Sequence, residues 1–221
     1  MAQYRFSELN LEIETASKSL KKNLERYKTH FDCKENLRLN ITYDILLSLM
    51  EENDGASAEI LENGYIATLY NCALFDFNGF PINATAVEND GRCVLFSSPF
   101  ENVDFFEKLP KNMVFDYDYP AVRLIDTTFM VYDTPFGSHG DLSRETRLPL
   151  TSIVFVDSDR FDTLKHLEPI DFIPFFVRAV AISIHQERTK HTLFMLEKLM
   201  HSIQFYGVKN VDDVNFILER V

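Results

Sequence analysis

The fold depends most on the stretch IDFIPFFVRAVAISIHQERTKHTLFMLEKLMHSIQFYG, residues 170–207. Its apolar side chains recur every three or four positions, which is the period of an α-helix. Two apolar stripes are out of phase with each other: Ile173, Val177, Val180, Ile184 and then Leu193, Leu196, Met200, Ile203. Either one helix changes its buried face midway, or two helices meet at a break. Because no Gly or Pro lies in the middle, the pattern favours one long core helix that ends at Gly207.

This stretch is not expected to cross a membrane. A membrane-spanning helix needs about 20 nearly uncharged residues, and four polar residues interrupt the apolar part: Asp171, Arg178, His185 and Glu187. The amino terminus lacks the apolar core of a signal peptide. The chain has three cysteines without metal-site spacing, which are Cys33, Cys72 and Cys93. We therefore expect a cytoplasmic protein with reduced thiols.

Length and charge limit the class of protein further. The chain has 221 residues, of which 46% are hydrophobic and 25% are charged, as in a globular protein with one substantial core. We expect a single domain over residues 1–221. The formal net charge is -12, and the acidic excess lies in residues 39–133, which contain four basic and sixteen acidic residues. Such a surface repels phosphate backbones, so direct nucleic-acid binding is not expected.

Residues 7–31 predict an N-terminal amphipathic helix that begins at Ser7. Its apolar positions follow spacings of four and three: Leu9, Ile13, Ala16, Leu20, Leu24, Tyr27 and Phe31. Two interpretations stay open, because the helix can lie on the protein's own core or protrude as an arm that docks on a partner subunit. In the second interpretation the contacts between chains are made by Leu9, Ile13, Leu20, Leu24 and Tyr27.

The middle of the chain predicts strands. A short strand is expected over residues 37–43, followed by a buried helix over residues 45–50. Three turn dipeptides typical of two-residue hairpins follow: Asn63-Gly64, Asn78-Gly79 and Asp90-Gly91. They predict an antiparallel meander of four strands over residues 58–98.

Further elements are expected downstream: a helix over 101–109, a strand pair around Tyr119-Pro120, a last strand over 150–156 and a short terminal helix. The predicted class is therefore α+β. An antiparallel meander or sheet is flanked by the N-terminal amphipathic helix and the long C-terminal core helix.

Two places contain residues suited to catalysis. Asp157 and Asp159 follow an apolar strand, where paired carboxylates can hold Mg²⁺ or Mn²⁺ beside a phosphate. The simpler interpretation is that one of them caps the next turn. The loop over residues 134–147 contains His139, a candidate general base. The simpler interpretation is a solvated loop with turn residues.

On the long helix, two Glu–His pairs at i,i+4 spacing are Glu187–His191 and Glu197–His201. The two pairs are out of line by about 80° around the helix, so they predict surface pairing and no metal site.

The predicted function is a non-enzymatic component that binds other proteins, such as a structural or adaptor subunit of a larger complex. The expected partners are proteins, including further copies of the same chain, and no cofactor is expected. The alternative is a metal-dependent enzyme that acts on phosphorylated substrates through Asp157, Asp159 and His139.

Overall fold

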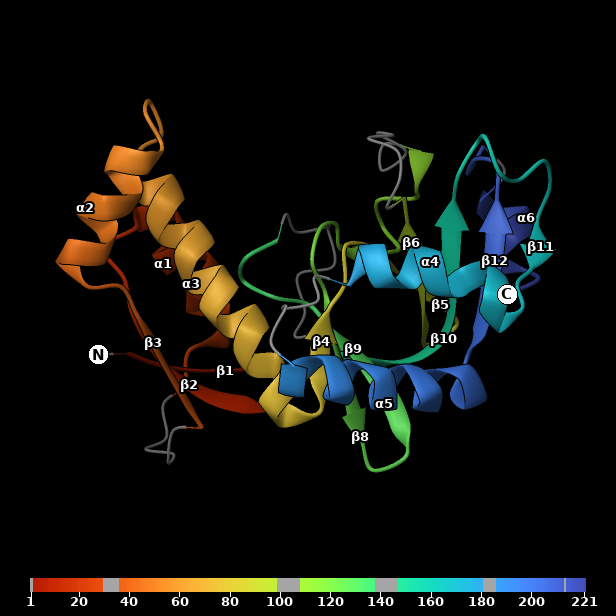
Figure 1. The fold of residues 1–221 in the computed structure, drawn as a ribbon, viewed down its shortest axis with the longest axis horizontal. Coiled ribbons are helices and arrows are strands. Elements are labelled where there is room, and N and C mark those ends of the chain that lie inside the picture. The colour runs from red at the N-terminus through yellow and green to blue at the C-terminus, as the bar shows by residue number, and fades with distance from the viewer. Residues whose placement is uncertain (1, 30–35, 99–107, 138–146, 181–185, 213) are drawn as a thin grey trace. The chain divides into compact units, whose positions relative to one another are not determined.

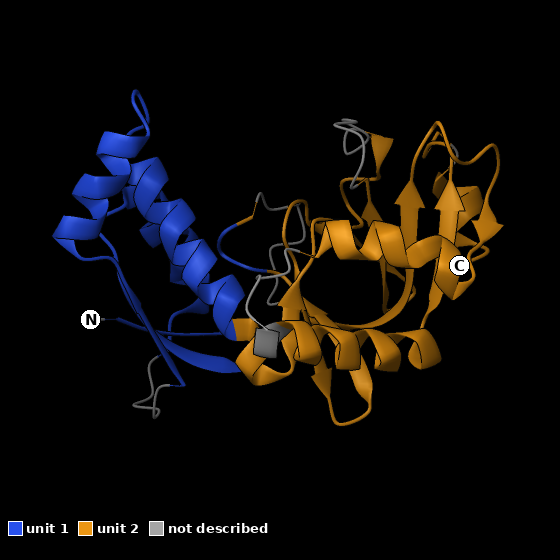
Figure 2. Cartoon of the chain, viewed as in Figure 1, with its two compact units in different colours: residues 1–73, 134–136 blue, residues 74–133, 137–221 orange. Residues whose placement is uncertain are grey.

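The computed structural model shows a mixed α/β fold. Six α-helices, a three-stranded sheet and a large curled mixed sheet lie among the described residues (Figure 1). The chain divides into two compact units, residues 1–73 with 134–136 and residues 74–133 with 137–221 (Figure 2). The structure describes residues 2–29, 36–98, 108–137, 147–180, 186–212 and 214–221.

The first unit contains the three-stranded sheet. Its strand order is β1-β2-β3, with β1 antiparallel to β2 and β2 parallel to β3. The strands are Ala2–Phe6, Leu9–Glu14 and Leu37–Asn40. Ser7 and Glu8 have positive φ values of 51 and 57, which suit the two-residue turn between β1 and β2. The strand predicted over residues 37–43 is thus confirmed for its first four residues.

The helix predicted over residues 7–31 is wrong for its first half. Leu9 and Ile13 fit both a helical period and the alternation of a strand, whereas Leu11 fits only the alternation. All three side chains are buried, so one face of β2 lies on the core. Among the described residues of this span, the helical part consists of α1 (Lys18–Leu24) and the following 3-10 turn η1 (Glu25–Tyr27).

The first unit also contains α2 (Tyr43–Glu52) and α3 (Ala58–Leu74). Helix α3 replaces the first half of the predicted meander, so that prediction is wrong. Residues rich in strand formers form a helix here because every fourth side chain is buried: Glu62, Ile66, Tyr70 and Leu74. The dipeptide Asn63-Gly64 lies inside the helix instead of in a hairpin turn.

The second unit is built on the large sheet. Its strand order is β4-β8-β9-β10-β6-β5-β7, with β12 paired to β10 and β11 paired to β12. The strands are β4 Gly79–Pro81, β5 Thr85–Asn89, β6 Arg92–Ser97, β7 Val114–Asp116, β8 Ala121–Ile125, β9 Thr128–Tyr132, β10 Arg147–Val156, β11 Lys165–His166 and β12 Gln204–Val208.

The sheet is mixed, which corrects the predicted antiparallel sheet. Strand β10 pairs antiparallel with β9 at its start and parallel with β6 and β12 farther along. Parallel neighbours need a long connection, and helices α4 (Pro169–Ala179) and α5 (Gln186–Ser202) lie in the connection between β10 and β12. The predicted strand over residues 150–156 is confirmed, but it lies inside the sheet and is not the last strand.

Two hairpins follow local sequence signals. The turn between β5 and β6 is Asp90-Gly91, with φ values of 49 and 75, so this part of the predicted meander is confirmed. The strands β8 and β9 pair around Asp126, which has a φ of 54. The strand pair predicted around Tyr119-Pro120 is therefore wrong, because residues 121–132 form a hairpin by themselves and β7, which precedes Tyr119, pairs with β5.

The described part of residues 170–207 forms two helices and a strand, so the favoured single helix is wrong. Helix α4 ends at Val180, whose backbone is extended (φ -88, ψ 118). The backbone N–H of Asn83 donates to the carbonyl oxygen of Ala179 at 2.8 Å, which satisfies one of the last carbonyls of this helix. Gly207 lies within β12 and does not cap a helix.

Both faces of the large sheet are covered. One apolar cluster contains Phe155 of β10 with Phe176 of α4 and Leu199 of α5, and the other contains Val154 with Ile217 of α6 (Val214–Leu218). Helix α6 is the predicted short terminal helix. The helix predicted over residues 101–109 lies mostly outside the described residues. None of the described helices has the length and apolar character that a membrane crossing needs.

Candidate interaction surface

The five residues predicted to contact a partner lie in the core of the first unit. Leu9, Ile13, Leu20, Leu24 and Tyr27 are at most 3% exposed. The Tyr27 ring packs against the buried ring of Phe6 in β1, with the two ring centroids 5.2 Å apart. A partner would reach these side chains only after they leave this core.

Two acidic residues of α3 hold the start of α1. The carboxylate of Glu59 accepts hydrogen bonds from the backbone N–H of Ser19 (2.8 Å) and the hydroxyl of Ser17 (3.1 Å). Buried Glu62 accepts a hydrogen bond from the backbone N–H of Ala16 at 2.6 Å. The bond from the Ser19 backbone is the main reason that the pKa of Glu59 is lowered. The sequence analysis missed this role, although the i,i+3 spacing of two acids on one helix face is a usable signal.

Helix α2 is the unusual element of the first unit, because none of its ten residues is buried. The helix predicted at residues 45–50 is confirmed, but its predicted burial is wrong. Tyr43, Leu47 and Met50 are 73%, 39% and 42% exposed. Their i, i+4, i+7 spacing places them within about 60° of one another around the helix. We call these three residues the α2 face. Large apolar side chains gathered on one exposed helix face are typical of a binding surface.

Local hydrogen bonds support α2 at both of its ends. The hydroxyl of Thr42 accepts from the backbone N–H of Ile45 at 3.4 Å at the start of the helix. At the end, the backbone N–H of Asn53 donates to the Leu49 carbonyl at 3.1 Å. The chain then turns at Gly55, whose φ of 86 suits glycine. The α2 face is therefore presented on a formed helix.

The surroundings of the α2 face are acidic. Residues 39–91 contain nine Asp or Glu and no Lys or Arg. Asp44 and Glu51 lie about 40–60° from Leu47 around the helix, and Glu52 and Asp54 follow at its end. Within the described part of the chain, these four carboxylates form no ion pair. Acids in the last turn oppose the helix dipole by about 0.3–1 kcal/mol each, so Glu51 and Glu52 do not serve the stability of α2.

The Asp157 carboxylate binds groups of its own turn. Asp157 is buried, and one of its oxygens accepts from the backbone N–H groups of Asp159 (3.0 Å) and Arg160 (3.1 Å). The side chain of Arg160 lies 3.4 Å from the other oxygen. Asp159 is exposed. This geometry is that of a turn cap.

The other residues predicted to carry chemistry lie on α5 or outside the described residues. His139 and the side chain of Glu187 lie outside the described residues, and His201 is exposed on α5. Among the residues that the structure describes, no group of three or more His, Cys, Asp or Glu is placed to hold a metal ion.

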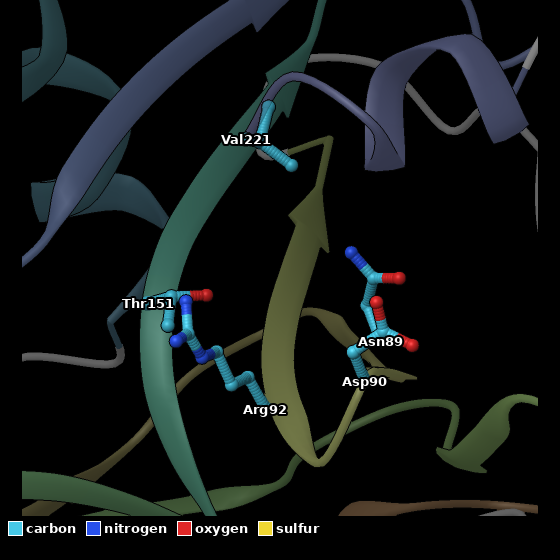
Figure 3. Close-up of a pocket in the computed structure, with 5 residues that line it drawn as sticks. All are labelled: Asn89, Asp90, Arg92, Thr151 and Val221. Atoms are coloured by element: carbon cyan, nitrogen blue, oxygen red, sulfur yellow. The ribbon is translucent and has the colours of Figure 1, made fainter.

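A polar pocket of about 300 Å³ lies in the second unit (Figure 3). It is lined by Asn89, Asp90, Arg92, Thr151 and Val221. The side chain of Asn89 donates to the Leu218 carbonyl (2.8 Å) and that of Thr151 donates to the Cys93 carbonyl (3.1 Å). These groups hold neighbouring backbone, and the lining residues include no pairing of a nucleophile with a base.

Comparison with known protein families, with curated proteins and with solved structures finds no match. The chemistry and geometry of the chain itself are thus the basis for assigning a function. Among its surfaces, the α2 face combines exposure, helical spacing and a uniform charge around it.

Proposed function

We propose that this protein is a non-enzymatic interaction or assembly component that binds a protein partner through the α2 face. The observation that supports this function is the exposure of Tyr43, Leu47 and Met50 on a helix with no buried residue. Apolar surface in water is unfavourable by about 25 cal/mol for each Å². A partner that covers the face removes this cost for the surface that the chain itself leaves exposed.

The spacing of the three residues supports a helical or grooved partner. Side chains at i, i+4 and i+7 are the anchors that amphipathic helices use when they bind in apolar grooves. The caps at Thr42 and Asn53 support a preformed helix. Preformed elements lose less conformational entropy on binding than disordered ones do.

The alternative function, metal-dependent catalysis on phosphorylated substrates, receives no specific support. Both Asp157 oxygens already face donors of the same turn, and Asp159 is exposed. A protein-binding role is therefore the better proposal.

Site-specific photo-crosslinking tests the proposal. A photoreactive amino acid replaces Leu47 in the full chain, and a control chain carries it in place of Ile170, which is 84% exposed on α4 of the second unit. In the cells that make this protein, position 47 is expected to give a covalent adduct with another polypeptide. Tyr43→Ser with Met50→Ser should strongly reduce the adduct, because the apolar anchors are lost.

The variants should stay folded, since surface substitutions usually change stability by less than about 0.5 kcal/mol. Circular dichroism checks this. If position 47 gives no adduct beyond that at position 170, the proposed function is wrong.

A further inference from the structure

We infer that the partner of the α2 face is a basic amphipathic helix, which places apolar residues on Tyr43, Leu47 and Met50 and Lys or Arg residues on the acids beside them. This inference rests on the proposed function and adds the chemical class of the partner. It follows from the charge around the face and from where those charges lie on the helix.

The acids beside the face are paired with no cation among the described residues. Asp44, Glu51, Glu52 and Asp54 lie in a part of the sequence without Lys or Arg, and the described residues place no ion-pair partner beside them. The same unit does pair acids elsewhere, because Arg38 of β3 holds Glu12 of β2 at 2.5 Å. Carboxylates that lie beside an apolar face and have no paired cation among the described residues favour a positively charged partner.

The position of Glu51 and Glu52 strengthens the inference. Both lie at the C-terminal end of α2, where the helix dipole is negative and Lys or Arg would be favoured. Two acids at this end make α2 less stable in the free chain. A bound partner that brings cations to this end offsets both the carboxylates and the dipole.

The same charges argue against other occupants. A second copy of the chain would set the acids of one α2 against the acids of the other, and like charges placed face to face destabilise an interface. Phosphate backbones and anionic lipid surfaces are repelled for the same reason. The occupant is therefore a cationic protein segment.

The dimensions fit a short helix. From Tyr43 to Met50 the face extends about 10 Å along the helix axis. Two to three turns of a partner helix cover this length with apolar residues at i, i+4 and i+7. Long Lys and Arg side chains on one flank then reach Asp44 and Glu51, which lie on one side of Leu47.

Three labelled helical peptides test the inference. All three carry Leu at i, i+4 and i+7, and they differ only in the flanking residues, which are Lys, Gln or Glu. Binding to the full chain is measured by fluorescence anisotropy at about 0.01 M and about 1 M salt, between which the screening length falls from about 30 Å to about 3 Å. The Lys peptide is expected to bind about tenfold more tightly than the Gln peptide at low salt, and this preference should vanish at high salt.

Two charge variants locate the effect. Asp44→Asn, Glu51→Gln and Glu52→Gln together should remove the preference for the Lys peptide. The matched control removes the same charge from exposed positions of the second unit, by Asp76→Asn with Asp126→Asn and Asp162→Asn. This control variant should still prefer the Lys peptide. Tyr43→Ser with Leu47→Ser should abolish binding of every peptide.

The outcomes separate the two proposals. If the Lys and Gln peptides bind equally and Tyr43→Ser with Leu47→Ser abolishes both, the basic partner is wrong and the α2 face remains a binding surface. If the control variant loses the preference as well, the charges beside α2 are not responsible and the inference is also wrong. Failure of all three peptides to bind likewise overturns it, while crosslinking at position 47 decides the proposed function independently.

Discussion

Gly207 is the position where a single added methyl group should have the clearest effect on stability. A Cβ atom at this position of β12 would lie 2.4 Å from two ring atoms of Phe161. Carbon atoms in contact are normally about 3.5–4.0 Å apart, so Gly207→Ala requires the ring to move by about 1 Å. The ring has little room to do so, because it stacks on Phe175 with centroids 5.4 Å apart.

This crowding should destabilise the protein by about 1–3 kcal/mol, the usual cost of overpacking a core. For a chain of this size, each kcal/mol lowers the melting temperature by about 2–4 °C. Urea and thermal unfolding followed by circular dichroism measure the loss. The control is Gly64→Ala in α3, where no heavy atom lies within 4 Å of the added Cβ. There the substitution should stabilise the helix by about 0.5–1 kcal/mol.

A double-mutant cycle tests the cause. Phe161→Leu removes the ring atoms that the new methyl group meets, so Gly207→Ala should cost much less in that background, with a coupling of about 1 kcal/mol or more. The reasoning is refuted if Gly207→Ala is as stable as the wild type, or if it costs the same with Leu at position 161.

Three further predictions concern titratable groups. Asp157→Ala should cost about 0.5–2 kcal/mol, because the backbone N–H groups of Asp159 and Arg160 lose their acceptor. Divalent cations should leave the melting temperature unchanged, and a Mg²⁺-dependent rise that is lost in Asp157→Asn would favour a metal site instead. Burial raises the pKa of the Cys93 thiol well above its usual range, so this residue should react with alkylating reagents more slowly than half-buried Cys72 in mass-spectrometric assays. The stability that protonated Cys93 contributes is complete below the ordinary thiol pKa of about 8.5. It is lost as pH rises through the raised pKa of the folded state. The free energy of unfolding of Cys93→Ala should therefore fall less at alkaline pH than that of the wild type. The pKa of Glu59 is lowered, chiefly by the Ser19 backbone N–H. The stability that ionised Glu59 contributes is therefore present above the ordinary glutamate pKa of about 4.3, and it is lost as pH falls through the lowered pKa of the folded state. Glu59→Gln should therefore reduce the acid sensitivity of the urea midpoint, and identical acid curves for variant and wild type would contradict this.

Several features of the fold were predictable from the sequence because neighbouring residues determine them. The hairpin at Asp90-Gly91 follows from the ease with which these residues adopt positive φ. The apolar run of β10 and the period of α2 are likewise local signals. Leu11 was a usable signal as well, since it fits only the alternation of a strand, and its burial in β2 agrees with that pattern.

Other features were decided only by contacts between residues far apart in the sequence. Helix α4 ends at Val180 without a Gly or Pro, next to a hydrogen bond from Asn83. Gly207 must be small because the ring of Phe161 lies against it. The site shows the same division. The sequence determined that α2 is an apolar helix and that its neighbours are acidic, but only the tertiary structure decided that none of its ten residues is buried. A helical period depends on the backbone of consecutive residues, whereas burial depends on which distant elements pack against them.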